Sequence, residues 1–376
     1  MGVHGLWEVL KPASTTEGIQ DYFIRAGFER PHCGRVYRLG IDASLWFHQV
    51  QSTFAVGHAQ SGENPELRTL FFWLARLLRL PIHAIFVFDG PERPAIKRGK
   101  RVVKMGHWMV DAMKNFIDAF GYEYCTAPGE AEAELAALNQ LGFVDGVLTD
   151  DGDAFLFGAQ TVIRNFNAKA QQLIITEADA VWTHDAVALG RWGMILIALF
   201  AGGDYNKDGL PGFGQRVAHG LARYGFGDTL CKAVRELEGE TLRVFLSGWR
   251  SDLRHALCTD DQKLLGRRYP ELSKRIPDTF PDLDIVDLYA RPVTSAFEDY
   301  EMSMPHPPDI AELGRLCERY FSWGTASGIV DRFGSCLIPG ILTRVLINLA
   351  INRDRLHSAR DPFVVCSSFA ECRRDT

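Results

Sequence analysis

The sequence predicts an α/β fold in which a mostly parallel central sheet is flanked by helices. Three short apolar runs, at residues 36–41, 84–88 and 143–148, have the character of buried strands, and each is followed by an aspartate or an aspartate cluster. Helical patterns lie between the runs, as the crossover connections of parallel strands require. The 376 residues are 47% hydrophobic and 23% charged, so the chain can bury a full core.

The first two strands deliver one aspartate each. A glycine-rich start at residues 2–12 precedes the strand 36–41, which ends at Asp42. Asn64 and Pro65 then indicate a helix start, with Asn64 as the N-cap and proline at the first helical position. The apolar spacing after Pro65 is helical. The run 84–88 follows as a second buried strand and leads directly to Asp89.

The segment 127–158 is the part of the chain around which we expect the rest to be organised. Pro128 and Gly129 are predicted to open a helix that begins with Glu130 and Glu132. The buried strand 143–148 follows. Its carboxyl end leads into a turn, and ligands bind at that edge of open α/β sheets.

Two carboxylate pairs in this segment predict a metal site. Asp151 and Asp153 flank a glycine in the turn, and Glu130 and Glu132 lie in a first helical turn, from which both can face one site. Carboxylates that share a site repel one another unless cations separate them, and oxygen ligands suit Mg²⁺ or Mn²⁺. The alternative is a solvated acidic helix start beside an Asp-rich turn. The repetition of strand-end aspartates favours the functional interpretation.

A basic segment follows Asp89. Residues 93–110 contain six Lys or Arg and no acid. The spacing of Lys97, Lys100 and Lys104 suggests one basic helix face, and a cationic arm beside an acidic metal site suits a phosphodiester substrate. The alternative is an ordinary solvated surface helix. The basic pentamer 97–101 also resembles a nuclear-localisation patch.

The second half of the chain is predicted to be mainly helical. A strand is expected at 173–176, and Thr183 is expected to cap a helix that runs to Gly202. The glycine-rich turn 203–214 can offer backbone N–H groups to a phosphate at a helix N-terminus. Residues 204–209 match the first six positions of an EF-hand calcium loop. At the twelfth position, however, where such a loop needs a bidentate Glu, this chain has Gln215. A helix restarts at 311–321.

Other features exclude several classes of protein. The net charge is −6, which by itself does not indicate a nucleic-acid partner. The eight cysteines form no C-x-x-C pair, so we expect no zinc site. We expect the protein to occupy a reducing compartment, in which cysteines stay unpaired. The start of the chain lacks the pattern of a signal peptide, and the apolar run 194–201 is too short to span a bilayer, so we expect no membrane partner.

The motifs taken together resemble the flap-endonuclease/XPG superfamily of structure-specific nucleases, and most of all its GEN-type branch of eukaryotic Holliday-junction resolvases. The resemblance spans roughly residues 1–350, with the motifs in the same order along the chain. It rests on MGVHGLW at the start, LGIDASLW at 39–46, FVFDG at 86–90, PGEAEAELAALN at 128–139, TDDGDAFLFGAQTVIRNF at 149–166 and GGDYNKDGLPGFG at 202–214.

The resemblance implies a set of site residues. The metal carboxylates would be Asp42, Asp89, Glu130, Glu132, Asp151, Asp153 and Asp204, while Asp150 falls outside the pattern and would cap or orient. Lys97 and Lys104 would contact the scissile phosphate. The residues expected to contact DNA are Gly2, Arg93, Arg98, Lys100, Arg101, Gly209, Gly212, Gly214 and Arg216.

The resemblance also implies an architecture and a reaction. A PIN-like nuclease core at 1–202 would precede a helix–two-turn–helix region at 203–276, a wrapping connection with a helical extension at 277–350, and a tail at 351–376. Two Mg²⁺ ions, replaceable by Mn²⁺, would promote hydrolysis that leaves a 5′-phosphate and a 3′-hydroxyl. A K⁺ ion would bind at the two-turn element. The implied partners are four-way junctions, flaps and a second copy of the chain, in the nucleus.

One departure from the family bears on the substrate. Only about forty residues separate Asp89 from Glu130, too few for the long arch through which flap endonucleases thread a single strand. This favours branched duplexes over free flaps. The alternatives are a flap or repair nuclease of the same superfamily, a phosphotransferase that forms an aspartyl-phosphate, and an inactive junction-binding scaffold. The phosphotransferase explains neither the basic segment nor the glycine-rich turn.

Overall fold

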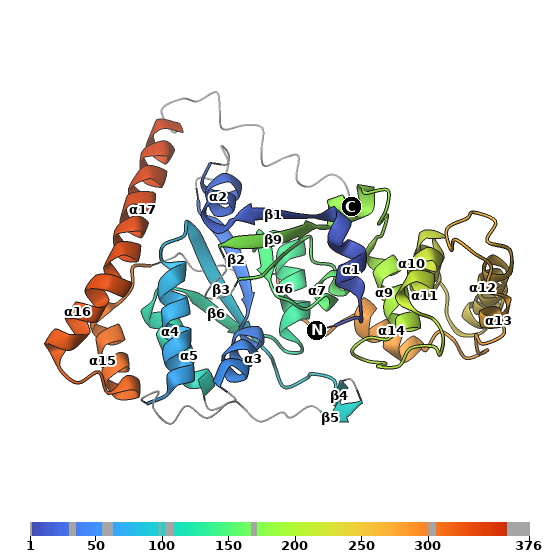
Figure 1. The fold of residues 1–376 in the computed structure, drawn as a ribbon, viewed down its shortest axis with the longest axis horizontal. Coiled ribbons are helices and arrows are strands. Elements are labelled where there is room, and N and C mark those ends of the chain that lie inside the picture. The colour runs from blue at the N-terminus through green and yellow to red at the C-terminus, as the bar shows by residue number, and fades with distance from the viewer. Residues whose placement is uncertain are drawn as a thin grey trace.

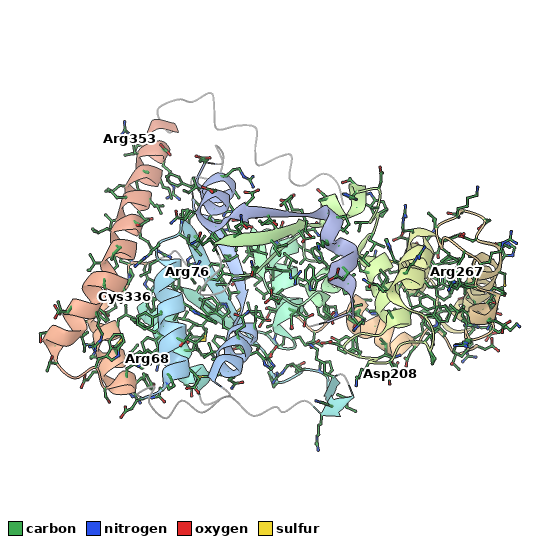
Figure 2. The ribbon with its side chains drawn as sticks, in the orientation of Figure 1. Arg68, Arg76, Asp208, Arg267, Cys336 and Arg353 are labelled. Atoms are coloured by element: carbon green, nitrogen blue, oxygen red, sulfur yellow. The ribbon has the colours of Figure 1, made fainter. Side chains whose placement is uncertain are left out.

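The computed structural model describes residues 2–29, 35–54, 63–97, 99–101, 109–166, 171–298, 300 and 306–358. A twisted central sheet lies between layers of helices, with helices α9–α14 gathered at one end of the molecule and α15–α17 at the other (Figure 1). Arg267 and Arg353 mark these opposite ends in Figure 2. The fold class predicted from the sequence is confirmed.

The seven-stranded sheet has the order β1-β9-β8-β7-β2-β3-β6. The strands from β8 to β6 in this order pair in parallel, whereas β9 pairs antiparallel with both β8 and β1. The sheet is therefore mostly parallel, with an antiparallel edge. Its strands are β1 (Ser14–Gly18), β2 (Tyr37–Asp42), β3 (Ile82–Phe88), β6 (Glu123–Thr126), β7 (Gly146–Leu148), β8 (Thr161–Arg164) and β9 (Gln172–Glu177).

Helices cover both faces of the sheet. The helices of the first half are α1 (Leu6–Leu10), α2 (Ile19–Phe23), α3 (Ala43–Phe54), α4 (Pro65–Leu77), α5 (Met109–Ala119), α6 (Ala131–Gln140), α7 (Asp153–Phe157) and α8 (Ala178–Thr183). Those of the second half are α9 (Arg191–Ala201), α10 (Gln215–Arg223), α11 (Phe226–Glu236), α12 (Gly239–Thr259), α13 (Pro270–Ser273), α14 (Leu283–Ala290), α15 (Ile310–Phe321), α16 (Ala326–Cys336) and α17 (Ile338–Ser358). A 3₁₀ turn at Lys11–Ala13 and a π-helix at Ile24–Phe28 complete the N-terminal segment.

The sheet separates two apolar cores, as the period of two in a strand requires. Along β3, Ile85 and Val87 belong to the core shared with α1, α6, α7 and α9. Ala84, Phe86 and Phe88 belong to the core shared with α3, α4, α5 and α15. A strand buried on both faces needs apolar residues at nearly every position, which is why β3 is a continuous apolar run.

Several expected elements differ in extent or type. Strands β1, β6 and β8 were not predicted, because they are short and polar residues interrupt them. The expected strand 143–148 is reduced to β7. The backbone N–H groups of Phe143 and Val144 donate to Leu138 O and close the end of α6, so these two residues are not available for the sheet.

Of three predicted helix starts, two are corrected and one is confirmed. Helix α6 begins at Ala131 with Glu130 as its N-cap, because the carbonyls of Pro128 and Gly129 accept N–H groups from the 90–92 segment. Thr183 ends α8 and does not cap α9, which begins after Gly190. Asn64 is the N-cap of α4 and Pro65 begins the helix, as predicted, although the Asn64 side chain donates to Tyr320 O and makes no capping hydrogen bond.

The predicted basic helix after Asp89 is wrong for the described residues. Strands β4 (Ile96–Lys97) and β5 (Lys100–Arg101) form a small antiparallel hairpin. Gly99 lies in its turn with φ of 70°, a conformation that suits glycine and interrupts a helix. Lys104 and Arg98 lie outside the described residues.

Three further observations concern expected absences and boundaries. None of the described cysteines, at 125, 231, 258, 317 and 336, is in a disulfide. No single helix in the described ranges is long and apolar enough to cross a membrane, and α16 with 338–356 passes such a test only as a pair bent by 52°. Helix α17 runs through the expected boundary at 350. The division into domains stays a prediction.

Candidate metal centre and its surroundings

The carboxylates gather at the carboxyl edge of the parallel strands. Asp42 is the last residue of β2, paired with Val87 of β3, and Asp89 follows β3 by one residue. Ile41 pairs with Leu148 of β7, so the turn that contains Asp151 begins beside Asp42. The register thus brings the three strand ends together, as predicted from the sequence.

Asp42 is buried and partly bonded. Its Oδ1 accepts the backbone N–H groups of Ser44 at 2.9 Å and Leu45 at 3.2 Å, at the start of α3. Thr149 Oγ1 approaches its Oδ2 at 3.4 Å. The side chain therefore acts as a helix cap on one side and faces the site on the other.

Asp89 connects three elements. Its Oδ1 accepts the backbone N–H of Ala131, the first residue of α6, at 3.0 Å. Its Oδ2 accepts Ser44 Oγ at 2.8 Å and Arg93 Nη1 at 3.0 Å. This carboxylate orients the start of α6, and with it Glu130 and Glu132.

Asp151 and Asp153 are buried in the turn after β7 and at the start of α7. Thr149 Oγ1 accepts the Asp151 N–H at 3.1 Å, and Asp151 Oδ1 accepts the Asp153 N–H at 3.1 Å. Asp153 Oδ1 also accepts the Val3 N–H at 3.0 Å. The N-terminal segment therefore packs directly on the carboxylates.

Gly2 touches the same two carboxylates. Its φ is 79°, and a Cβ at this position would lie 2.2 Å from Asp151 Oδ1 and 2.4 Å from Asp153 Oδ1. Only glycine combines this backbone conformation with so close an approach. The structure thus places Gly2, expected to contact DNA, at the edge of the carboxylate group.

Lys97 connects carboxylates from two further elements. Its Nζ lies 2.5 Å from Glu130 Oε1, 3.0 Å from Asp204 Oδ2 and 4.0 Å from Glu132 Oε1. Asp204 follows α9 and is buried, as are both glutamates. The hairpin of β4 and β5 therefore inserts one cation among the acids.

Burial and mutual repulsion disturb the protonation of the group. Burial, followed by the charge of Asp89, raises the pKa of Asp42 to about 7. Burial likewise raises the pKa of Glu132, Asp151 and Asp153. Burial lowers the pKa of Lys97, but the charges of Glu132, Glu130 and Asp204 outweigh it and raise that pKa well above its usual value. The cluster holds more negative charge than one lysine balances.

The donor set fits a divalent cation in its chemistry. All seven predicted ligands offer carboxylate oxygen, six of them are buried, and oxygen-only sets select hard cations such as Mg²⁺ and Mn²⁺. Among the described side chains, no three His, Cys, Asp or Glu are arranged to hold an ion as they stand. Lys97 lies between Glu130 and Asp204, so ligands on that side have to turn when an ion binds. Burial of so many acids is otherwise unfavourable.

Two tyrosines were missed in the sequence. Tyr205 Oη donates a hydrogen bond to Glu130 Oε2, and the centroid of the Tyr205 ring lies 4.6 Å from that of Tyr289. Tyr205 is adjacent to Asp204 in the chain, which is a usable signal. Tyr289 has none, because only the tertiary fold brings α14 to this place.

A groove opens beside the carboxylates. Its volume is about 800 Å³, and it is lined by the N-terminal segment, Arg164 and the loop 201–208. Arg164 stacks over the Trp7 ring at 3.8 Å, and Trp7 Nε1 donates to Asp150 O. Asp150 itself contacts Gln49 at 3.2 Å. The described contacts of the Asp150 side chain are with Gln49, Asn165 and Arg164, outside the seven carboxylates, and its expected role stays a prediction.

The predicted phosphate-binding turn lies between α9 and α10. Gly209 and Gly212 have φ of 57° and 91°, and Gly214 precedes α10 with open space around it. Arg216 is exposed in the first turn of α10. The loop that follows α9 carries Asp204 and leads directly into this turn. The N-terminus of α10, at the end of the turn, is exposed to solvent.

The remaining basic residues divide into two groups. Arg93 is half-buried and bonded to Asp89, so it belongs to the carboxylate group. Lys100 and Arg101 are exposed on the hairpin, outside the group. No description is possible for Arg98 and Lys104, which lie outside the described residues.

The family models agree with this arrangement. The XPG N-terminal domain matches residues 1–104 and the XPG I-region matches residues 121–204. Together they span half of the chain and contain all seven carboxylates. The fold and the acidic strand edge define an XPG-type α/β core, and the chain belongs to the XPG/flap-endonuclease superfamily, in its GEN branch.

Individual relatives support the same assignment. The chain is 31% identical to flap endonuclease GEN homolog 1 of Mus musculus over 255 residues, which is 63% of this chain but 26% of that protein. It thus spans about a quarter of the mouse relative. It is similar to the junction-resolving enzyme GEN-1 bound to sodium, with a TM-score of 0.75, 31% identity and coverage of 90% and 78% of the two chains. The chain is also similar to the Holliday junction-resolving enzyme GEN1 in complex with product DNA and Mg²⁺. The TM-score is 0.71 and the identity 31%, and the match covers 92% of this chain and 80% of that chain.

Proposed function

We propose that this chain is a divalent-metal-dependent endonuclease that cuts branched DNA and resolves four-way junctions by paired symmetric nicks. The observation that carries the proposal is the gathering of seven carboxylates, six of them buried, of which Glu130, Glu132 and Asp204 lie within 4.0 Å of Lys97 Nζ. Membership of the superfamily and similarity to a junction-resolving enzyme with product DNA add support.

The proposed chemistry assigns different tasks to the residues. Asp42, Asp89, Glu130, Glu132, Asp151, Asp153 and Asp204 would hold two Mg²⁺ or Mn²⁺ ions directly or through water. The bound ions would supply an activated water and charge stabilisation for phosphodiester hydrolysis that leaves a 5′-phosphate and a 3′-hydroxyl. Arg93 holds Asp89 in place through their 3.0 Å ion pair. Lys97 offers its ammonium to the scissile phosphate when it turns from Glu130 and Asp204.

Binding of the duplex is assigned to the exposed cations and the open helix end. Lys100 and Arg101 on the hairpin offer charge to the phosphate backbone, as Lys104 and Arg98 would nearby. The N-terminus of α10, with Gly209, Gly212, Gly214 and Arg216, offers backbone N–H groups. A K⁺ ion at this turn is part of the proposal, and the similar structure of GEN-1 with potassium supports it.

Two further parts of the proposal concern the assembly and the cell. Paired nicks across a symmetric junction require two copies of the chain, one for each strand that is cut. The reason is that each chain carries a single cluster of metal-binding carboxylates. We also propose a nuclear location, supported by the basic pentamer at 97–101 and by the eukaryotic relative. Imaging of a fluorescent fusion of the full chain in eukaryotic cells, with a 97–101 alanine variant beside it, tests the location.

One experiment tests the reaction and its substrate. The protein is incubated with an intact four-way junction and with a 5′ flap, with and without Mg²⁺. Paired symmetric nicks in the junction that disappear without Mg²⁺ support the proposal. The mouse relative is named a flap endonuclease, so cleavage of the flap alone would replace junction resolution with flap processing and keep the metal site. Tight junction binding without cleavage under any divalent metal would favour an inactive scaffold.

A further inference from the structure

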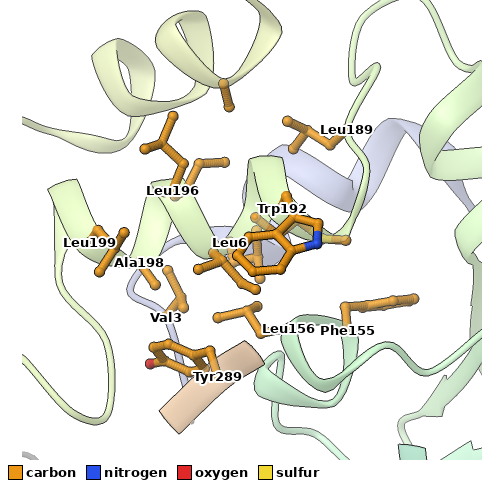
Figure 3. Packing of buried hydrophobic residues seen from close by; sticks show 14 of the residues in the cluster. Val3, Leu6, Phe155, Leu156, Leu189, Trp192, Leu196, Ala198, Leu199 and Tyr289 are labelled. Carbon is orange, nitrogen blue, oxygen red and sulfur yellow. The ribbon is translucent and has the colours of Figure 1, made fainter. Parts of the chain in front are cut away.

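Tyr289 is a buried side chain beside the metal centre to which the proposed mechanism gives no task. It lies in α14 and is 1% exposed. Its ring packs on Tyr205 at 4.6 Å and on Phe157 at 6.0 Å between centroids. Figure 3 shows the ring at the margin of the apolar cluster with Val3 and Leu156, and the phenol oxygen at the end turned away from Leu156.

The hydroxyl of Tyr289 has no hydrogen-bond partner among the described residues. The backbone N–H of Asp204 comes near enough to affect its pKa, yet the contact falls outside good hydrogen-bond geometry. A buried tyrosine hydroxyl nearly always has a hydrogen-bond partner, and a buried hydroxyl without one destabilises the folded protein. The hydrogen of this phenol therefore lacks an acceptor in the protein alone.

The direction of the hydroxyl points to its task. A Cβ on Gly203 would lie 2.6 Å from Tyr289 Oη, so the absence of a side chain at 203 admits the phenol next to Asp204. Burial, then the charges of Asp153 and Asp204, raise the pKa of Tyr289 well above its usual value. The hydroxyl therefore lies beside the backbone residue that precedes Asp204, one of the predicted metal ligands.

The neighbouring tyrosine shows what such a phenol does here. Tyr205 Oη donates to Glu130 Oε2, on the side of the acidic group that Lys97 also contacts. The two hydroxyls approach the acidic residues at different points, Tyr205 Oη at Glu130 and Tyr289 Oη beside Gly203, the residue before Asp204. Only the first hydroxyl has its acceptor in the described structure.

We propose that Tyr289 is a positioning residue of the metal centre, whose hydroxyl donates to the Asp153–Asp204 side when a divalent cation is bound. This rests on the proposed function, because it presumes that these aspartates bind the ion. Residues that orient metal ligands typically change metal affinity 10–100-fold when removed. The competing interpretation is that Tyr289 only packs against Tyr205 and Phe157.

Tyr289→Phe separates the two interpretations, since it keeps the ring and removes the hydroxyl. Titration calorimetry with Mg²⁺ on the full chain without DNA should show an affinity lower by about 10–100-fold. The matched control is Tyr22→Phe, which removes a buried hydroxyl that bonds Tyr37 Oη at 3.1 Å, away from the acidic group. Its Mg²⁺ affinity should equal that of the wild type.

Two further readouts complete the test. The metal-free melting temperature of Tyr289→Phe should match or exceed that of the wild type, because the variant loses an unpartnered polar group. Its cleavage deficit should shrink as the Mg²⁺ concentration rises. An Mg²⁺ affinity within twofold of the wild type would overturn the inference alone. Failure of the wild type to bind Mg²⁺ would overturn the proposed function as well.

Discussion

The ammonium of Lys97 lies 2.5 Å from Glu130 Oε1 and 3.0 Å from Asp204 Oδ2. Lys97 belongs to the hairpin of β4 and β5. Among the described lysines and arginines, it alone bridges two of the buried carboxylates. This ion pair joins a segment on one side of the sheet edge to the start of α6. It also partly balances an acidic group whose members repel one another. The consequences of this contact, and of the group around it, can be measured.

Replacement of Lys97 should weaken the metal-free protein. Lys97→Met leaves Glu130 and Asp204 without their cation, and removal of one partner of a buried ion pair is strongly destabilising. We expect the metal-free melting temperature to fall by at least about 4 °C and junction cleavage to fall with it. Differential scanning calorimetry measures the first effect. Lys100→Met, on the same hairpin but exposed, should leave the melting temperature unchanged.

Removal of one carboxylate should abolish activity and yet stabilise the metal-free protein. Asp42→Asn is expected to lower junction cleavage by more than about 100-fold, since ligands matter at least as much as the groups that orient them. At about pH 8 it also removes a charge that burial disfavours, so the free energy of unfolding should rise. Asp150→Asn is the control and should retain cleavage, because Asp150 lies outside the group. Equal cleavage by Asp42→Asn and the wild type would contradict the metal site.

The stability of the metal-free protein should depend on pH. The folded pKa of Asp42 is about 7, above its ordinary value of 3.8, so folding favours the protonated carboxyl. The stability contributed by this group is fully present below about pH 4 and is lost as the pH rises through about 7. Glu132, Asp151 and Asp153 shift in the same direction. Urea unfolding at about pH 5, 6, 7 and 8 should show a free energy of unfolding that decreases as the pH rises. Saturating Mg²⁺ should make this decrease smaller. A decline unaffected by Mg²⁺ would place its origin elsewhere.

Gly2 should tolerate no side chain. Alanine there combines a φ of 79° with a Cβ at 2.2 Å from Asp151 Oδ1, so the N-terminal segment or the carboxylate has to move. We expect Mg²⁺ affinity and junction cleavage to fall at least tenfold, by about 1.4 kcal/mol or more. Gly142→Ala provides the matched control, because Gly142 has φ of 75° and open space around it. It should show the backbone strain alone, with Mg²⁺ binding intact.

The exposed hairpin cations should affect DNA affinity through salt. Lys100→Ala with Arg101→Ala removes two charges that face solvent. If both contact phosphates, the slope of log affinity against log salt should become shallower by about two, with little loss of junction preference. Fluorescence anisotropy on a junction and on a linear duplex over a range of KCl concentrations measures both. An unchanged slope would remove the hairpin from the DNA interface.

Residues that follow buried strands carried most of the correct sequence predictions. Asp42, Asp89 and Asp151 were expected at one edge because each comes directly after an apolar run, and parallel strands end together. Glu130 and Glu132 were expected nearby because both were placed at the start of a helix, and the structure has them as the N-cap and the second residue of α6. These inferences hold because the period and position of side chains relative to the backbone are local properties.

The errors have a different physical origin. The segment 96–101 has helical charge spacing, yet it forms a hairpin, because charge spacing on an exposed segment does not fix its backbone and Gly99 favours a turn. Strands β1, β6 and β8 are short and form through pairing with partners distant in sequence. Local propensity is weak for such strands, since their stability comes from their neighbours.

The sequence by itself determined the fold class and the gathering of strand-end carboxylates at one edge of the sheet, because the order of apolar and acidic residues along the chain is a local property. Only the tertiary structure placed Lys97 between Glu130 and Asp204, brought Gly2 against Asp151 and Asp153, and set the hydroxyl of Tyr289 beside Asp204. These contacts join residues up to about 150 positions apart. They depend on how the hairpin, the N-terminal segment and α14 pack on a completed sheet, and no local pattern encodes that packing.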